Sequence, residues 1–213
     1  MTLDVTYQNN KNTRSKRNLE ENEKGKPIKD FIKNLSEEQK MKFWIKTLLS
    51  SQKTFPEIIK TLDRIIELQA SSVSFASSIY NLENPTFKQV EKVIDLSERK
   101  TFLLNIYLMS KELTKGLSST DSEFLEKKFV YNLSVETLAK EFDISPRTVY
   151  RKTNKLIDEI YAKITRKNWS LEFLESQIKN EFWLKSRFIS QVTDYVRNTN
   201  ILSNNQSKSS SES

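Results

Sequence analysis

Apolar residues recur at spacings of three and four along most of this chain, which is the period of an amphipathic helix. The clearest case starts at Thr54, which is expected to cap a helix with Pro56 in its first turn and Glu57 three residues on. The apolar face of that helix is predicted to consist of Ile58, Ile59, Leu62, Ile65, Ile66 and Leu68. No segment of useful length alternates apolar and polar residues as a half-buried strand does. The pattern therefore predicts an all-α protein.

Further helices flank this one. Ser36 and Gln39 have the spacing of a capping box, and the helix they start carries Phe43 and Trp44 in its apolar stripe. The dipeptide Asn84-Pro85 predicts a break. A short helix at 86–96 and a longer one at 97–115 are expected after it. Gly116 is expected to end the longer helix, because glycine adopts the left-handed conformation found at many helix ends.

These elements divide the chain into five parts. The tails, residues 1–34 and 200–213, are expected to be disordered because they hold too few apolar residues to offset the entropy of ordering. Residues 35–116 are predicted to form a helical domain that binds a polymerase or mediates dimerisation. Residues 121–166 are predicted to form a compact helical unit after a short linker. Residues 168–199 are predicted to form one amphipathic C-terminal helix.

The sequence of residues 121–166 predicts three short helices. Asn132 follows the first, where a left-handed residue is commonly needed, and asparagine tolerates that conformation. Ser134 is expected to cap the second helix, and Ala139 is small enough for a close helix crossing. Ser145 is expected to cap the third, with Pro146 at its first position, where a missing N–H costs nothing. Two helices joined by such a short turn predict a helix-turn-helix.

The outward side of the third helix is strongly cationic near its start. A helix-turn-helix places the N-terminal half of its second helix in the major groove of DNA. Arg147 and Arg151 lie one turn apart and suit bidentate contacts to guanine, and Asn154 suits adenine. The two lysines in this stretch are expected to contact phosphates. The candidate DNA-binding residues are Ser145, Pro146, Arg147, Thr148, Tyr150, Arg151, Lys152, Asn154 and Lys155.

Composition supports an anionic partner and argues against catalysis. The 213 residues carry a formal net charge of +7 and a sequence pI of about 9.3, which favours nucleic acid first and acidic membrane second. The absence of cysteine and histidine excludes a structural zinc site and the common thiol and Ser-His nucleophiles. Two glycines are too few for a phosphate-cradling loop. No catalytic residue, cofactor or metal site is therefore expected, and the chain is not expected to be an enzyme.

No signal core and no spanning apolar run is seen in the sequence. A cytoplasmic protein without membrane contact is therefore expected.

The stretch FLEKKFVYNLSVETLAKEFDISPRTVYRKTNKLIDEI resembles the C-terminal, fourth conserved region of bacterial sigma factors of the sigma-70 type. It follows, without a gap, the family pattern of a leucine-rich helix, Y-x-x-G-x-S-x-x-E-I-A-x-x-L-x-I-S-x-x-T-V. Asn132 replaces the usual glycine, Leu138 an isoleucine and Thr153 a common apolar residue. The similarity covers about a fifth of the chain.

The resemblance implies that this unit reads the upstream promoter element and touches the flap of RNA polymerase. It implies DNA contacts by Arg147, Thr148, Tyr150 and Arg151, with residues 134–142 as the supporting helix. The partners expected on this basis are promoter double-stranded DNA and the RNA polymerase core. The function expected is that of a divergent alternative sigma-like factor.

Two alternatives stay open. Related units occur in response regulators and in phage late-gene activators, so the chain could instead be a phage-type activator that binds as a homodimer and does not replace sigma. It could also be an interaction protein whose DNA binding is incidental.

The stretch MKFWIKTLL, with Phe43 and Trp44, faintly resembles the part of a sigma factor that melts DNA with exposed aromatic residues. Packing of both rings in a core is the competing interpretation.

Overall fold

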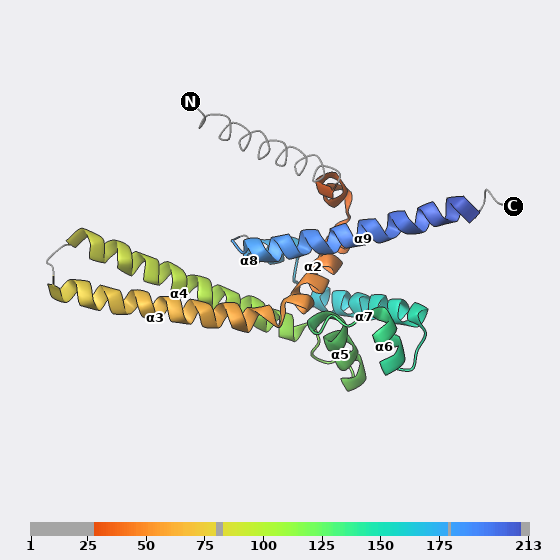
Figure 1. The fold of residues 1–213 in the computed structure, drawn as a ribbon, viewed down its shortest axis with the longest axis horizontal. Helices are drawn as coiled ribbons and strands as arrows, with labels where there is room; N and C mark the ends of the chain where they lie inside the picture. The colour runs from red at the N-terminus through yellow and green to blue at the C-terminus, as the bar shows by residue number, and fades with distance from the viewer. Residues whose placement is uncertain (1–27, 80–82, 179, 210–213) are drawn as a thin grey trace, which may run out of the picture.

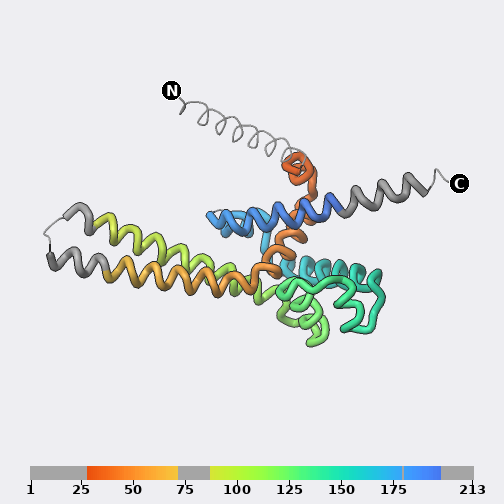
Figure 2. Tube along the Cα trace, in the orientation of Figure 1, coloured from red at the N-terminus to blue at the C-terminus, as the bar shows by residue number. Residues whose placement is uncertain are grey.

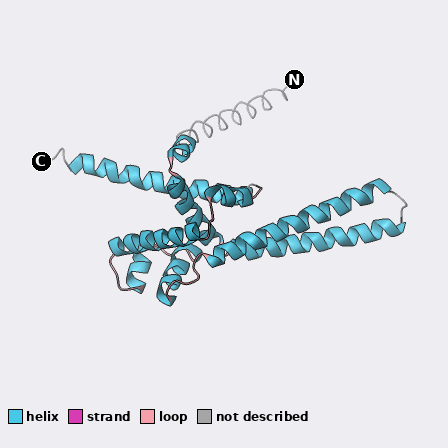
Figure 3. Ribbon diagram, turned by 180° about the vertical axis from the view of Figure 1, so that it is seen from behind, coloured by secondary structure: helices cyan, strands magenta, loops and turns pink. Residues whose placement is uncertain are grey.

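The computed structural model describes residues 28–79, 83–178 and 180–209, and for residues 72–86 and 198–209 it describes the backbone alone. Every regular element in the described residues is a helix, which confirms the all-α prediction (Figure 3). In chain order they are a helix at 28–34, α2 (Glu37–Ser51), α3 (Thr54–Ile79), α4 (Glu83–Glu112), α5 (Ser119–Leu125), the π-helical turn η1 (Glu126–Val130), α6 (Val135–Glu141), α7 (Pro146–Arg166), α8 (Leu171–Ile178) and α9 (Phe182–Ser209).

The helices form a body with one long arm. Helices α3 and α4 pack side by side as an antiparallel hairpin that projects from the body (Figure 1). Figure 2 shows the coloured parts of α3 and α4 running side by side away from the body. Helices α5 to α7 lie on one side of the body, and α9 crosses it on the other (Figure 1).

Helix α2 is the centre of the body, because it packs against α4, η1, α7, α8 and α9. It starts at the predicted capping box: Ser36 Oγ accepts from the backbone N–H of Gln39, whose side chain accepts from the N–H of Ser36. The buried rings of Trp44 and Phe188 stack with their centroids 4.3 Å apart. Phe43 meets Phe188 edge-on at 6.3 Å. Burial of Phe43 and Trp44 supports core packing over base stacking for this stretch.

A buried ion pair fixes the corner between α8 and α9. The Glu181 carboxylate is 1% exposed and accepts hydrogen bonds from Arg99 Nε and Nη2 at 3.0 and 3.1 Å. The indole N–H of Trp183 donates a third bond to it at 2.9 Å. A fully bonded carboxylate tolerates burial, and its hydrogen bonds raise the pKa of Arg99. The prediction of one helix at 168–199 was therefore wrong, since the chain turns here between two helices.

Other helix boundaries also differ from the predicted ones. Residues 86–112 lie in one helix, because the Ser97 hydroxyl donates to the carbonyl of Val93 at 2.8 Å instead of capping a new helix. Helix α5 begins at Ser119, inside the expected linker, with the Ser118 side chain accepting from the N–H of Asp121. Gly116 has the expected left-handed conformation, with a φ of 88°, but α4 ends at Glu112, three residues before the predicted end of the helix.

Both segments predicted to be disordered contain helix where the structure describes them. Residues 28–34 are helical, and the ring of Phe31 lies 6.4 Å from that of Tyr195. The backbone of α9 stays helical through residue 209, so residues 200–209 do not form the expected irregular tail. Residues 1–27 and 210–213 lie outside the described residues.

No helix in the described ranges is both long enough and apolar enough to span a bilayer.

Candidate nucleic-acid interface

Two left-handed residues shape the chain between α5 and α7. Asn132, predicted to adopt this conformation, has a φ of 54°, and the next N–H, that of Leu133, donates to the carbonyl of Lys127 at 3.0 Å. Asp143 has a φ of 50° in the turn between α6 and α7. The N–H of Ile144 then donates to the carbonyl of Ala139 at 2.9 Å. These bonds satisfy backbone groups at the helix ends and fix the direction in which α7 starts.

The predicted N-caps are both confirmed. Ser134 Oγ accepts from the backbone N–H of Thr137 at 3.1 Å, and Ser145 Oγ accepts from that of Thr148 at 3.1 Å. Pro146 occupies the first position of α7. The start of α7 is therefore fixed to the residue by local chemistry.

The inner side of the unit is apolar and closely packed. The rings of Phe124 and Phe142 meet edge-on with their centroids 5.2 Å apart. Leu138 of α6 and Val149 of α7 are fully buried. Ala139 is buried as well, in the helix α6 that packs against α7. A larger side chain there would overpack this contact by roughly 1–3 kcal/mol.

Helix α7 buries one side along its whole length. Its buried residues are Val149, Thr153, Leu156, Ile157, Ile160 and Ile164. The Thr153 hydroxyl donates to the carbonyl of Val149 at 2.8 Å, so burial of this side chain leaves its hydrogen bond intact. The Asp158 carboxylate pairs with Lys42 of α2 at 2.7 Å, and this contact raises the pKa of Lys42.

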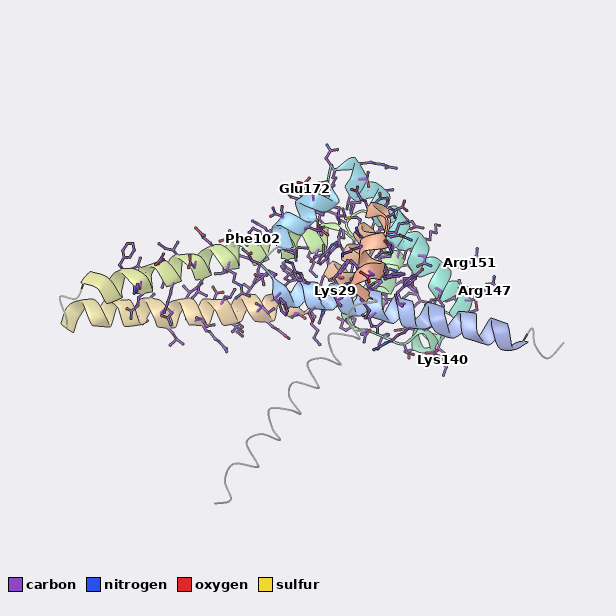
Figure 4. All side chains as sticks on the ribbon, turned by 90° about the horizontal axis from the view of Figure 1, so that it is seen from above. Lys29, Phe102, Lys140, Arg147, Arg151 and Glu172 are labelled. Atoms are coloured by element: carbon purple, nitrogen blue, oxygen red, sulfur yellow. The ribbon has the colours of Figure 1, made fainter. Side chains whose placement is uncertain are left out.

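The opposite side of α7 near its start is free for a partner. The first turn contains no acidic residue, and among the described residues neither Arg147 nor Arg151 forms an ion pair. Figure 4 shows both arginines at the same end of α7. Tyr150 lies between them in sequence and is 61% exposed. The predicted residues that are exposed are Ser145, Pro146, Arg147, Thr148, Tyr150, Arg151, Asn154 and Lys155.

Lys152 differs from the other predicted residues because it is half-buried. Its Nζ lies 2.8 Å from the Asp121 carboxylate and 5.1 Å from the centroid of Phe124. The hydrogen bond from Lys152 lowers the pKa of Asp121. Lys152 thus joins α7 to α5, and its charge is already paired inside the unit, which argues against the phosphate contact expected of it.

Lys140 is a cation that the sequence reasoning missed. It is exposed in the last turn of α6 and lies at the same end of the body as Arg147 in Figure 4. A basic residue ending the supporting helix is the signal that could have identified it.

The described part of the chain contains no group of three or more side chains placed to hold a metal ion. The arrangement can attract and position an anionic polymer. No family model, curated protein or solved structure matches this chain.

Proposed function

We propose that this protein binds double-stranded DNA through the start of α7 and acts as a sigma-like transcription factor that directs RNA polymerase to promoters. One observation carries the proposal. The first turns of α7 keep their aliphatic residues buried and expose Arg147, Tyr150 and Arg151 together. The helix N-terminus adds its own partial positive charge to this face.

The geometry suits a major groove. Helix α7 has 21 residues and is about 31 Å long, so its start can enter a groove about 12 Å wide while its end stays in the body. Arg147 and Arg151 present forked donors that fit guanine edges, and the ring of Tyr150 offers apolar surface for a thymine methyl group. Lys155 is exposed one turn after Arg151, Lys140 is exposed in the last turn of α6, and both would contact phosphates.

Removing the two arginines tests the interface. In Arg147→Ala plus Arg151→Ala, we expect affinity for promoter fragments to fall at least about tenfold, because each bidentate contact discriminates by roughly 1–3 kcal/mol. The slope of log K against log salt should change by less than about 0.9, the contribution of one phosphate contact, because both arginines are expected to reach base edges. Fluorescence anisotropy of labelled duplexes over a salt series measures both quantities.

A matched control removes two cations elsewhere. Lys60 and Arg64 have the same spacing on α3, are exposed, and form no ion pair among the described residues. The variant Lys60→Ala plus Arg64→Ala should bind DNA as the unchanged protein does. If both double variants lost the same amount of DNA affinity, the loss would come from the lower net charge alone, and the α7 interface would be refuted.

A dimeric activator that uses the same face without replacing sigma is the second candidate. Exposed apolar residues on α4, such as Ile94 and Leu108, favour it because they provide surface for a second chain.

A further inference from the structure

Helix α4 has a row of apolar side chains on the solvent side of the arm. Phe87 is 71% exposed, Ile94 52% and Leu108 61%, and Val90 and Leu104 lie between them, partly exposed. Exposure of this much apolar surface along one helix is unusual for a surface with no partner. We define the α4 seam as Phe87, Val90, Ile94, Ser97, Thr101, Leu104 and Leu108.

The seam has the spacing of a coiled coil. Its positions are separated alternately by three and four residues, which is the a/d pattern of a heptad repeat. Another side of α4, including the fully buried Leu103, serves the hairpin and the body. The seam therefore does not belong to the hairpin contact and remains available for a further helix.

The two polar positions of the seam can be buried at little cost. The Ser97 hydroxyl donates to the carbonyl of Val93 at 2.8 Å, and the Thr101 hydroxyl donates to the carbonyl of Ser97 at 3.0 Å. Burial of a hydroxyl is expensive mainly when its hydrogen bond is lost. Both donors stay satisfied when another helix covers them.

The charges of the arm favour a second copy of this chain as the partner. Residues 54–112 contain seven basic and eight acidic residues, a formal charge of −1, whereas the whole chain carries +7. The flank of the seam is mixed in sign, with Lys88, Glu91, Lys92, Asp95 and Glu98. The net positive charge of the chain lies outside the arm, so the nearly neutral arms of two copies can approach each other with little repulsion. A partner of one strong charge would find no matching surface here.

We propose that the α4 seam is a homodimer interface, in which the seams of two copies pack against each other as a coiled coil. From Phe87 to Leu108 the seam is about 32 Å long at about 1.5 Å per residue, enough for three heptads. The inference does not depend on DNA binding by α7.

Oligomeric state of the full chain tests the proposal. Sedimentation equilibrium should show a monomer–dimer equilibrium at micromolar concentrations. Ile94→Glu plus Leu108→Glu should raise the dimer dissociation constant at least about tenfold, because each buried aliphatic side chain contributes on the order of one decade. The change should leave the far-ultraviolet circular dichroism unaltered, since both side chains are more than half exposed.

The matched control is Phe173→Glu plus Phe182→Glu, which changes two exposed apolar residues outside the arm. It should dimerise as the unchanged protein does. Thr101→Leu gives a test in the other direction, because it fills the polar centre of the seam and should tighten the dimer. A chain that stays monomeric at about 100 µM, or a dimer equally stable in the α4 double variant, overturns the proposal.

Discussion

Ser145 caps α7 and also lies on the surface that we propose as the DNA interface. Its hydroxyl accepts from the backbone N–H of Thr148, and it stands beside Arg147 on the exposed side of α7. The cap contributes to the free energy of unfolding, and the position beside Arg147 would affect the proposed DNA affinity. Two substitutions separate them.

Ser145→Ala removes the cap and should lower the free energy of unfolding by about 1 kcal/mol. Ser145→Asp keeps an acceptor at the cap and suits the helix dipole, so stability should change little. The new negative charge beside Arg147 should nevertheless weaken DNA binding several-fold, because it would face phosphates. Urea unfolding and anisotropy titrations measure the two effects. Undiminished DNA affinity in Ser145→Asp would place the duplex elsewhere.

At the residue scale, the sequence predicts what depends on near neighbours. The caps at Ser134 and Ser145 and the left-handed Asn132 are all set within a few positions, and each was found as predicted. The role of Lys152 was not predictable in this way, because its partner Asp121 lies in another helix. The spacing of apolar residues shows on which face of a helix a lysine lies, but it does not show which carboxylate of another helix will pair with that lysine.

At the scale of elements, the helix end that the sequence pattern did not predict lies at a contact between residues far apart in the chain. The break between α8 and α9 coincides with Glu181, whose partner Arg99 comes from the middle of α4. Phe182 follows that break directly and is 83% exposed. After the break Leu184, Phe188 and Val192 are buried, so the spacing of apolar residues still describes the inner side of α9. Only the position of the break depends on the distant partner Arg99.

The contact between α2 and α9 provides a sharp test of packing. Phe188→Ala removes the ring stacked on Trp44 and should lower the free energy of unfolding by about 3–5 kcal/mol, through lost burial and a cavity. The matched change Phe182→Ala affects an exposed ring and should stay within about 0.5 kcal/mol. Denaturant unfolding followed by tryptophan fluorescence reports both. Similar losses at the two positions would contradict the packing of α9 on α2.

For the whole molecule, the decisive question is whether the body recruits RNA polymerase or only DNA. Purified protein added to sigma-free core polymerase should start transcription at specific promoters if the chain is a sigma-like factor. A dimeric activator would instead raise transcription only when a sigma factor is already present. Run-off transcription distinguishes the two outcomes. Loss of the signal in Arg147→Ala plus Arg151→Ala, with no loss in Lys60→Ala plus Arg64→Ala, ties either result to α7.

The central position of α2 has a consequence for the protein while it is being made. Ser50, at the end of α2, accepts a hydrogen bond from Arg187 of α9, which lies 137 residues further along the chain. At a synthesis rate of about 5–20 residues per second, α2 leaves the ribosome roughly 7–27 seconds before this partner exists. Throughout that interval the ring of Trp44 has no Phe188 to cover it. The apolar side of α2 around Trp44 therefore stays uncovered during that interval, so a chaperone that binds exposed apolar segments would act on α2.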